Sequence, residues 1–370
     1  MKNVLFATTA LVAMGGTAFA GGHTGITFGG SAEIGVFMID SEIPLGSPGA
    51  RRENDGDLRL HHDMDMDITF SGTTDNGLTF GADVDLDEIS GGISSNAGPH
   101  TVFVSGAFGT LTIGDTDGAF DKALTEIAVG STIADDPEHG GYSGNSGLDG
   151  LYDGQIARYD YAFGDLTFSV SVELDDDEGD GVIGSGLAAS SGGGSNVAAD
   201  GDPIFGVGVA WSGDFGGTTL GVGIGYQTVD VDALQFRPAA ADNAGGAAQT
   251  AGVPTDVPSA VGTHEFVGAS VTAGFGALTA IVNFTTSDRP VGFGDDDYIG
   301  VSLEYVAGDL TVGANWGEND NSVSGATDGF GVFASYALAD GVALVAGYGS
   351  SETAGGIGTD RASVGLGLSF

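Results

Sequence analysis

The chain has 370 residues, among them 69 Gly, no Cys, and 51 Asp and Glu against 9 Lys and Arg, for a net charge of -42. The glycine content argues against a helical protein, because each interior Gly costs a helix about 1 kcal/mol relative to Ala, and the absence of Cys excludes disulfides, thiolate metal sites and cysteine nucleophiles. So few basic side chains also exclude nucleic acid as a partner, since its phosphates are bound by clusters of Lys and Arg.

Residues 1–20 have the pattern of an export signal. Lys2 supplies a positive charge, residues 4–13 form a short apolar segment, and Ala18 and Ala20 flank Phe19 in a small-x-small cleavage site. The mature chain is expected to begin at Gly21. No later run of about 18 apolar residues predicts a membrane-spanning helix. The exported chain is therefore either soluble or crosses a membrane as strands.

Alternation decides between these two possibilities. In residues 57–71 one set of alternate positions is apolar except for His62, and the other set is polar and rich in Asp. Residues 77–88 repeat the pattern, with Leu78, Phe80 and Val84 on the apolar side. Strands of soluble proteins are usually about 5–6 residues long. Longer strands with one apolar and one carboxylate-rich face suit a barrel that has lipid outside and water inside.

The same pattern recurs to the end of the chain. It predicts sixteen strands at residues 26–39, 57–71, 77–88, 100–107, 110–115, 156–163, 166–174, 204–212, 218–229, 264–274, 278–286, 298–306, 310–316, 328–337, 342–349 and 360–370. Seven short turns alternate with eight longer loops, as expected for an antiparallel meander. The prediction is an all-β fold, a 16-stranded antiparallel transmembrane β-barrel over residues 21–370, which is wide enough for an aqueous channel.

Glycines fall on the polar side of several predicted strands, for example Gly221, Gly223 and Gly225. Such small residues would keep the bore open. The alternative is that they relieve strand curvature.

Two stretches resemble a known family. Residues 70–82 and 101–115, together with an alternating final strand that ends at Phe370, are similar to the general diffusion porins of the Rhodobacter type. The resemblance implies a homotrimer in the outer membrane of a Gram-negative bacterium, in contact with lipid and lipopolysaccharide. Small or polar residues on the outward side, such as Gly30, Ala32 and His62, are candidates for the subunit contact, with lipid contact as the alternative.

The resemblance also implies an inward-folded third loop that constricts the pore. Here that loop covers residues 115–155, and residues 119–128 within it have helical spacing. The carboxylates expected at the constriction are Asp121, Glu126, Asp135 and Asp136, with Glu138 beside them, and the basic residues expected on the facing wall are Arg59 and Arg158. Two alternatives remain open: an acidic surface loop without this role, and arginines that pair with neighbouring wall carboxylates.

The wall next to this loop is acidic where the family usually has a basic cluster. The predicted pore wall carries Asp63, Asp65, Asp67, Asp83, Asp85 and Asp87. Because rings of Asp and Glu select cations, we predict a cation-selective channel.

A later loop contains a dense group of oxygen ligands. Asp175, Asp176, Asp177 and Asp180 are candidate ligands for calcium, although the spacing of an EF-hand is missing. Plain solvated acidic residues are the alternative. The predicted function requires no cofactor.

The predicted function is an outer-membrane porin that passes small hydrophilic solutes and ions by passive diffusion. The sequence contains none of the nucleophile-elbow, zinc-protease, phosphate-loop or dinucleotide motifs, so no enzymatic activity is expected. One alternative is a secreted calcium-binding β-solenoid or surface protein, although short tandem repeats are lacking. The other is a substrate-specific outer-membrane channel.

Overall fold

The structure, a computed structural model, describes residues 24–44, 51–54, 56–86, 100–127, 130, 132–152, 154–174, 197–236, 262–289 and 294–370. Three predictions fall outside the described residues: the signal segment 1–20, the wall residue Asp87, and the candidate calcium ligands Asp175, Asp176, Asp177 and Asp180.

Long antiparallel strands make up almost all of the described chain. The wall is formed by β1 (Thr24–Pro44), β3 (Arg59–Thr73), β4 (Thr79–Asp85), β5 (His100–Gly106), β6 (Gly109–Asp115), β7 (Gln155–Phe163), β8 (Leu166–Glu173), β10 (Ile204–Phe215), β11 (Thr218–Phe236), β12 (Gly262–Phe275), β13 (Leu278–Asp288), β14 (Asp296–Ala307), β15 (Leu310–Asn321), β16 (Gly325–Ala339), β17 (Val342–Thr353) and β18 (Gly358–Ser369). Two short strands, β2 (Arg51–Asn54) and β9 (Val197–Gly201), extend the pairing of β1 and β11. The described helix is α1 (Ala119–Ala123).

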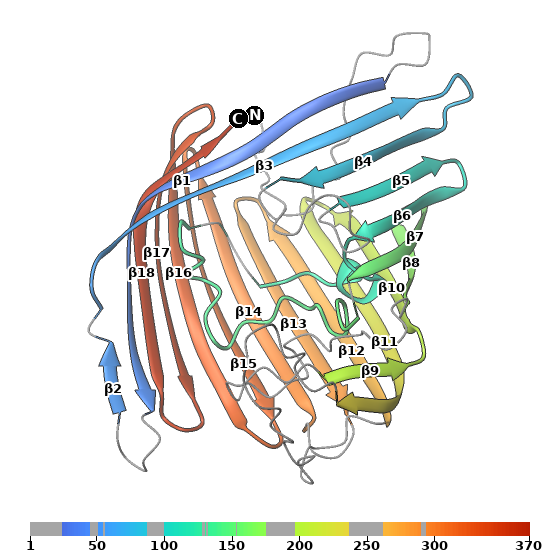
Figure 1. Ribbon diagram of the computed structural model, residues 1–370. Helices are drawn as coiled ribbons and strands as arrows, with labels where there is room; N and C mark the ends of the chain where they lie inside the picture. Colours follow the sequence, from blue (N-terminus) through green and yellow to red (C-terminus); the bar gives the residue numbers. More distant parts are fainter. Residues whose placement is uncertain are drawn as a thin grey trace, which may run out of the picture.

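Each wall strand pairs with the next along the chain, and the sheet closes on itself (Figure 1). The closing pair is β1 with β18, in which Gly35 lies opposite Gly365 and Ile34 opposite Leu366. All the pairings are antiparallel. The prediction of a 16-stranded antiparallel barrel is therefore confirmed.

The two faces of the wall differ as the alternation predicts. On β10, Phe205, Val207 and Val209 are exposed, whereas the alternate residues Gly206 and Gly208 are buried on the inner side. Exposed aliphatic and aromatic side chains continue around the outside of the barrel. A continuous apolar outer surface is far larger than a soluble monomer tolerates, and it matches the lipid-facing band of an outer-membrane barrel.

The short turns are built on glycine. Each of the seven predicted turns contains a glycine in the left-handed region, for example Gly276 and Gly308, both with φ of 65°. This conformation costs glycine little.

The predicted alternation of short and long connections fails near the end of the chain. The strands there extend beyond the predicted bounds, so only residues 322–324 join β15 to β16, and only residues 354–357 join β17 to β18.

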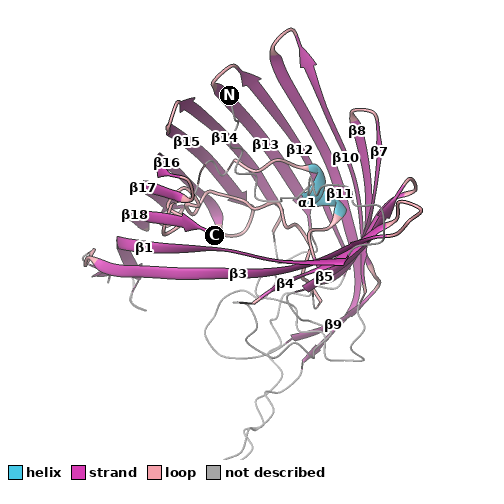
Figure 2. Cartoon of the chain, turned by 90° about the horizontal axis from the view of Figure 1, so that it is seen from above, coloured by secondary structure: helices cyan, strands magenta, loops and turns pink. Residues whose placement is uncertain are grey.

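In the part of the chain that the structure describes, the buried hydrophobic clusters lie between the wall and one internal segment. This segment, residues 116–154, is called L3 (Figure 2). One cluster joins Leu148, Leu151 and Tyr152 of L3 to Ile204 and Val229 of the wall. A second joins Ile127 of L3 to wall residues Ile281, Tyr298 and Phe333. In the part of the chain that the structure describes, no helix has the length and hydropathy of a membrane span.

Candidate functional site

L3 crosses the interior of the barrel from β6 to β7 (Figures 1 and 2). Its helix, α1, packs on β8, β10 and β11 through the buried side chains of Ala119, Phe120 and Ala123. Helical spacing predicted a helix over residues 119–128, but the helix ends at Ala123 because Leu124 is extended, with ψ of 157°. The prediction that the third loop folds inward agrees with this arrangement.

The beginning of L3 is attached to the wall by polar side chains. The backbone N–H of Ala119 donates to the Ser171 hydroxyl at 2.8 Å, and that of Thr125 donates to the Ser270 hydroxyl at 2.8 Å. The amide of Asn283 donates to the Thr125 carbonyl at 2.8 Å. These wall residues are buried, so their bonds to L3 satisfy groups that water cannot reach.

The end of L3 is attached through two carboxylates. Glu173 on β8 accepts hydrogen bonds from the backbone N–H groups of Gly150, Tyr152 and Gly154, at 3.0, 3.2 and 2.9 Å. Asp149 accepts from the Gly118 N–H at 2.7 Å and thereby ties the end of L3 to its beginning. Together these bonds hold the end of L3 against the wall and against its own beginning.

L3 contains the acidic residues predicted for the constriction, and they differ in their exposure. Asp135 and Glu138 are exposed, whereas Asp121 and Glu126 are half-buried. Asp136 is completely buried: its carboxylate accepts from the Ser363 hydroxyl and its N–H donates to Thr132 Oγ1. Asp136 therefore attaches L3 to the wall, and its predicted place in the open pore is wrong. Asp135 has φ of 49°, and this left-handed turn lets adjacent carboxylates face opposite sides.

Opposite the exposed part of L3 lies the wall formed by β1 and β3. Asp135 interacts electrostatically with His61 and Asp63 on β3 and with Arg361 on β18. On the neighbouring strand, Glu33 lies 3.5 Å from His61 Nε2. Among the described residues, the carboxylates of Asp135, Asp63 and Glu33 thus lie near one another, together with His61 and Arg361.

Burial shifts the pKa values of the L3 carboxylates upward. Burial raises the pKa of Asp121 to about 8, and the neighbouring charges of Asp117, Glu126 and Asp149 act in the same direction. Burial also raises the pKa of Asp149, to about 6, against the hydrogen bonds it accepts. The pKa of Glu126 is raised by burial although Tyr142 donates to it, and burial raises the pKa of Asp135 and Glu138 as well. Not all of L3's formal negative charge is therefore present at neutral pH.

The two arginines expected at the constriction have different positions. Arg158 is buried, donates from Nε to Asp160 at 3.0 Å and from Nη1 to Thr116 Oγ1 at 3.2 Å, and also donates to the Asp117 carbonyl. It therefore joins the wall to the start of L3 and pairs with a wall carboxylate, which is the alternative interpretation given for the arginines. Arg59 is exposed near the beginning of β3.

The predicted wall aspartates that the structure describes lie on the inner face. Asp63, Asp65 and Asp67 are exposed on the side of β3 that carries His61, and Asp83 and Asp85 lie on β4. Asp67, Asp83 and Asp85 border a cavity of about 270 Å³. The rest of its lining includes His100, Asp115 and Asp117, so carboxylates dominate this part of the lumen.

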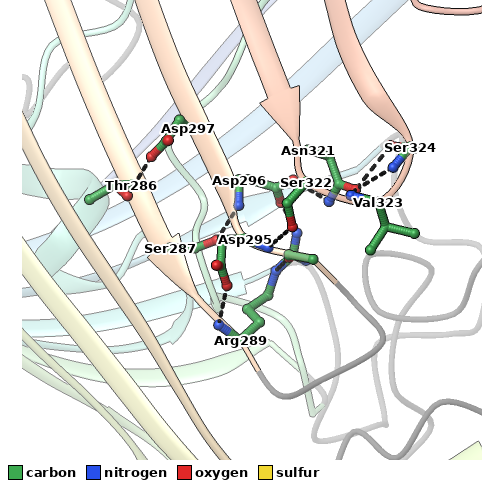
Figure 3. A network of polar contacts seen from close by, with 11 residues as sticks. Thr286, Ser287, Arg289, Asp295, Asp296, Asp297, Asn321, Ser322, Val323 and Ser324 are labelled. Atoms are coloured by element: carbon green, nitrogen blue, oxygen red, sulfur yellow. Dashed lines mark hydrogen bonds and ion pairs between the residues drawn. The ribbon is translucent and has the colours of Figure 1, made fainter.

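A polar network lies outside L3, where β13 and β15 end and β14 begins (Figure 3). The Arg289 guanidinium donates to the Asp296 carboxylate and to the Gly294 carbonyl, and Asn321 donates to the other oxygen of Asp296 at 2.6 Å. The network joins the ends of these neighbouring strands. Among the described residues, no group of three or more His, Cys, Asp or Glu is arranged to hold a metal ion.

Apart from Arg158, the wall residues that attach L3 were not predicted. They are polar side chains at inward positions of the wall: Ser171, Glu173, Gln227, Ser270, Asn283, Asn315 and Ser363. The signal was present, because amides and hydroxyls replace glycine or Asp at lumen positions of the alternating strands. Their partners, however, are groups of L3 far away in the sequence, mostly backbone groups but also side chains such as the Asp136 carboxylate.

Comparison with known proteins agrees with this architecture. The chain matches the family model of Gram-negative porins over residues 7–356, and it belongs to this family. It is 32% identical over 166 residues to a porin of Rhodobacter capsulatus, an alignment that covers 44% of this chain and about half, 48%, of that relative.

Solved structures show the same fold. A porin structure refined at 1.8 Å matches with a TM-score of 0.65 at 23% identity, covering 94% of this chain and 100% of that one. A mutant of the Rh. blastica porin matches with a TM-score of 0.52 at 20% identity, covering 93% and 100%. The predicted resemblance, the porin fold and the location in the outer membrane of a Gram-negative bacterium are confirmed.

Proposed function

We propose that the protein is a homotrimeric channel through which small hydrophilic solutes and ions cross the outer membrane by passive diffusion. The observation that carries this proposal is the attachment of L3 inside a closed barrel, with Asp135 and Glu138 exposed on it. A barrel of this size encloses an aqueous lumen. L3, which is attached to the wall inside the barrel, gives that lumen a narrow section. No chemical reaction is assigned to the chain.

The proposed channel is cation-selective. The narrow section brings Asp135 close to Asp63 and Glu33, while the nearby basic groups are His61 and Arg361. Because carboxylate rings attract cations and repel anions, the potential in this region favours cations even when Asp121 is protonated.

The test is conductance of the purified protein in a planar bilayer under a salt gradient. The proposal expects large conductance steps in groups of three and a reversal potential of cationic sign. An anionic reversal potential would reject the selectivity and retain the channel, whereas a folded protein without conductance would reject the channel itself.

A substrate-specific channel is a second candidate, supported by the acidic cavity beside Asp67, Asp83 and Asp85. Such a channel would be recognised by conductance that micromolar amounts of one cationic solute block.

We retain calcium binding at Asp175, Asp176, Asp177 and Asp180 as a further proposal, tested by calorimetric titration of the purified trimer. We propose the outward face around Gly30, Ala32 and His62 as the subunit contact, with lipid and lipopolysaccharide covering the remaining outer surface.

A further inference from the structure

The inner wall is unusually close to L3 at a set of glycines. A Cβ atom added to Gly223 on β11 would lie 1.8 Å from the Ala123 carbonyl oxygen, and one added to Gly331 on β16 would lie 2.5 Å from Pro137 Cα. A Cβ added to Gly347 on β17 would lie 2.5 Å from the Asp136 carboxylate. Real Cβ atoms essentially never come within 3.0 Å of another heavy atom in this way, so L3 occupies the space that other side chains would fill.

Each of these glycines lies directly opposite a polar residue that binds L3. Gly223 pairs with Ser270, whose hydroxyl accepts from the Thr125 N–H at 2.8 Å. Gly331 pairs with Asn315, whose amide donates to the Pro137 carbonyl at 2.9 Å. The same Gly-polar arrangement therefore occurs in two parts of the wall.

A third pair completes the series. Gly347 lies opposite Ser363, whose hydroxyl donates to Asp136. Directly opposed residues of an antiparallel pair share one face of the sheet, so in every pair the missing side chain and the binding side chain point at the same segment of L3. The polar partner brings L3 to hydrogen-bond distance, and the glycine leaves room for that distance.

We propose that these three Gly-polar pairs are the positioning residues of L3 and thereby determine the free cross-section of the pore. Hydrogen bonds alone would determine only which atoms of L3 contact the wall. The glycines also fix how near L3 comes to the wall, and whatever space L3 leaves on its other side is the pore. This inference rests on the proposed channel function, because pore width has meaning only for a protein that conducts.

The predicted effect of adding one methyl group follows from the distances. An alanine at Gly223 requires a displacement of about 1.2 Å, the difference between 1.8 and 3.0 Å, and backbone of L3 is the group that must move. The wall strand is held by ladder bonds on both sides, so L3 moves toward the pore axis. Gly223→Ala and Gly331→Ala are therefore expected to lower single-channel conductance by about 1.5-fold and to slow the passage of larger sugars more than smaller ones.

Matched controls lie on the same inner face outside the contact with L3. At Gly221 an added Cβ would be 3.6 Å from Thr272 Cβ, an ordinary contact, and at Gly367 it would meet nothing within 4 Å. Gly221→Ala and Gly367→Ala are expected to conduct like the natural protein. An equal loss of conductance in Gly221→Ala would overturn the inference, because any methyl group in the lumen would then have the same effect.

The experiment uses full-length protein in planar bilayers and in liposomes that swell with sugars of increasing size, and heat resistance of the trimer in detergent reports folding. A milder variant, Gly268→Ala, meets only the side-chain atoms of Leu124 and Phe120, and it should give a smaller reduction if Gly223→Ala fails to fold. Unchanged conductance and size dependence in heat-resistant variants at Gly223, Gly331 and Gly268 would overturn the inference. A natural protein that does not conduct would instead overturn the proposed function.

Discussion

Glu173 on β8 and Gly154 at the end of L3 are joined by a hydrogen bond of 2.9 Å from the glycine N–H to the carboxylate. The same carboxylate also binds the N–H groups of Gly150 and Tyr152. One carboxylate therefore accepts hydrogen bonds from three backbone N–H groups that would otherwise have no partner. Glu173 is only 2% exposed, so water could not take its place.

Replacing this carboxylate should loosen the end of L3. In Glu173→Gln the amide nitrogen is a donor, so at least one of the three N–H groups loses its acceptor, at a cost of about 1–3 kcal/mol. Hydrogen exchange of residues 150–154 should become faster, with the barrel strands unaffected. Glu304→Gln, on the inner face of β14, is the control, and equal exchange in both variants would contradict this role of Glu173.

Asp135 and Asp136 are neighbours with separate expected effects. Asp135 is exposed opposite Asp63 and Asp136 is buried against Ser363. Asp135→Asn should shift the reversal potential toward zero without changing protease resistance of L3. Asp136→Asn should leave the reversal potential nearly unchanged and make L3 sensitive to protease. If Asp136→Asn instead shifts the reversal potential and Asp135→Asn makes L3 sensitive to protease, the two side chains have the opposite orientations.

The negative charge of the narrow section should increase between pH 6 and pH 9. Burial raises the pKa of Asp121 to about 8, so this group is largely protonated at pH 7 and ionises above pH 8. Cation selectivity should rise across that range, and the rise should be missing in Asp121→Asn. Reversal potentials at a fixed salt gradient measure it, and a pH-independent natural protein would exclude the effect.

The same shift has a consequence for stability. Because the folded pKa of Asp121 lies above its ordinary value of 3.8, folding favours the protonated form. The stabilisation is complete below that value and is lost as the pH rises through about 8. L3 should therefore become progressively more susceptible to protease as the pH rises from about 4 to about 8, and Asp121→Asn should not show this change.

Arg158 and Arg59 should also respond differently to removal of charge. Arg158→Gln loses the bonds to Thr116 and Asp117 and leaves Asp160 without its ion pair, so noisy conductance and a lower thermal stability of the trimer are expected. Arg59→Gln removes an exposed charge, and it should change only selectivity, toward cations. Noise recorded at constant voltage separates the two, and quiet channels in Arg158→Gln would reject the anchoring role.

The sequence alone determined the architecture, and it did so through period-two alternation. Each strand must present an apolar side to lipid and a polar side to water, so the pattern of residues 57–71 or 77–88 is visible without knowledge of any partner. The order of short turns and longer loops added the antiparallel connections, and the similarity of residues 70–82 and 101–115 to porins added the family. Strand number and outward face were predicted from these local features, and the internal third loop was implied by the resemblance to porins.

The tertiary structure alone decided what each residue near the pore does. Asp135 and Asp136 are adjacent and chemically identical, yet of the two carboxylates it is that of Asp136 that accepts a hydrogen bond from Ser363 of the wall. Closure of the barrel brings Ser363 against Asp136 although the two are 227 positions apart along the chain. Gly223 looked like a residue that keeps the bore open, but its empty space is filled by Ala123 of L3. Such roles depend on contacts between distant segments, and closure of the barrel brings those segments together.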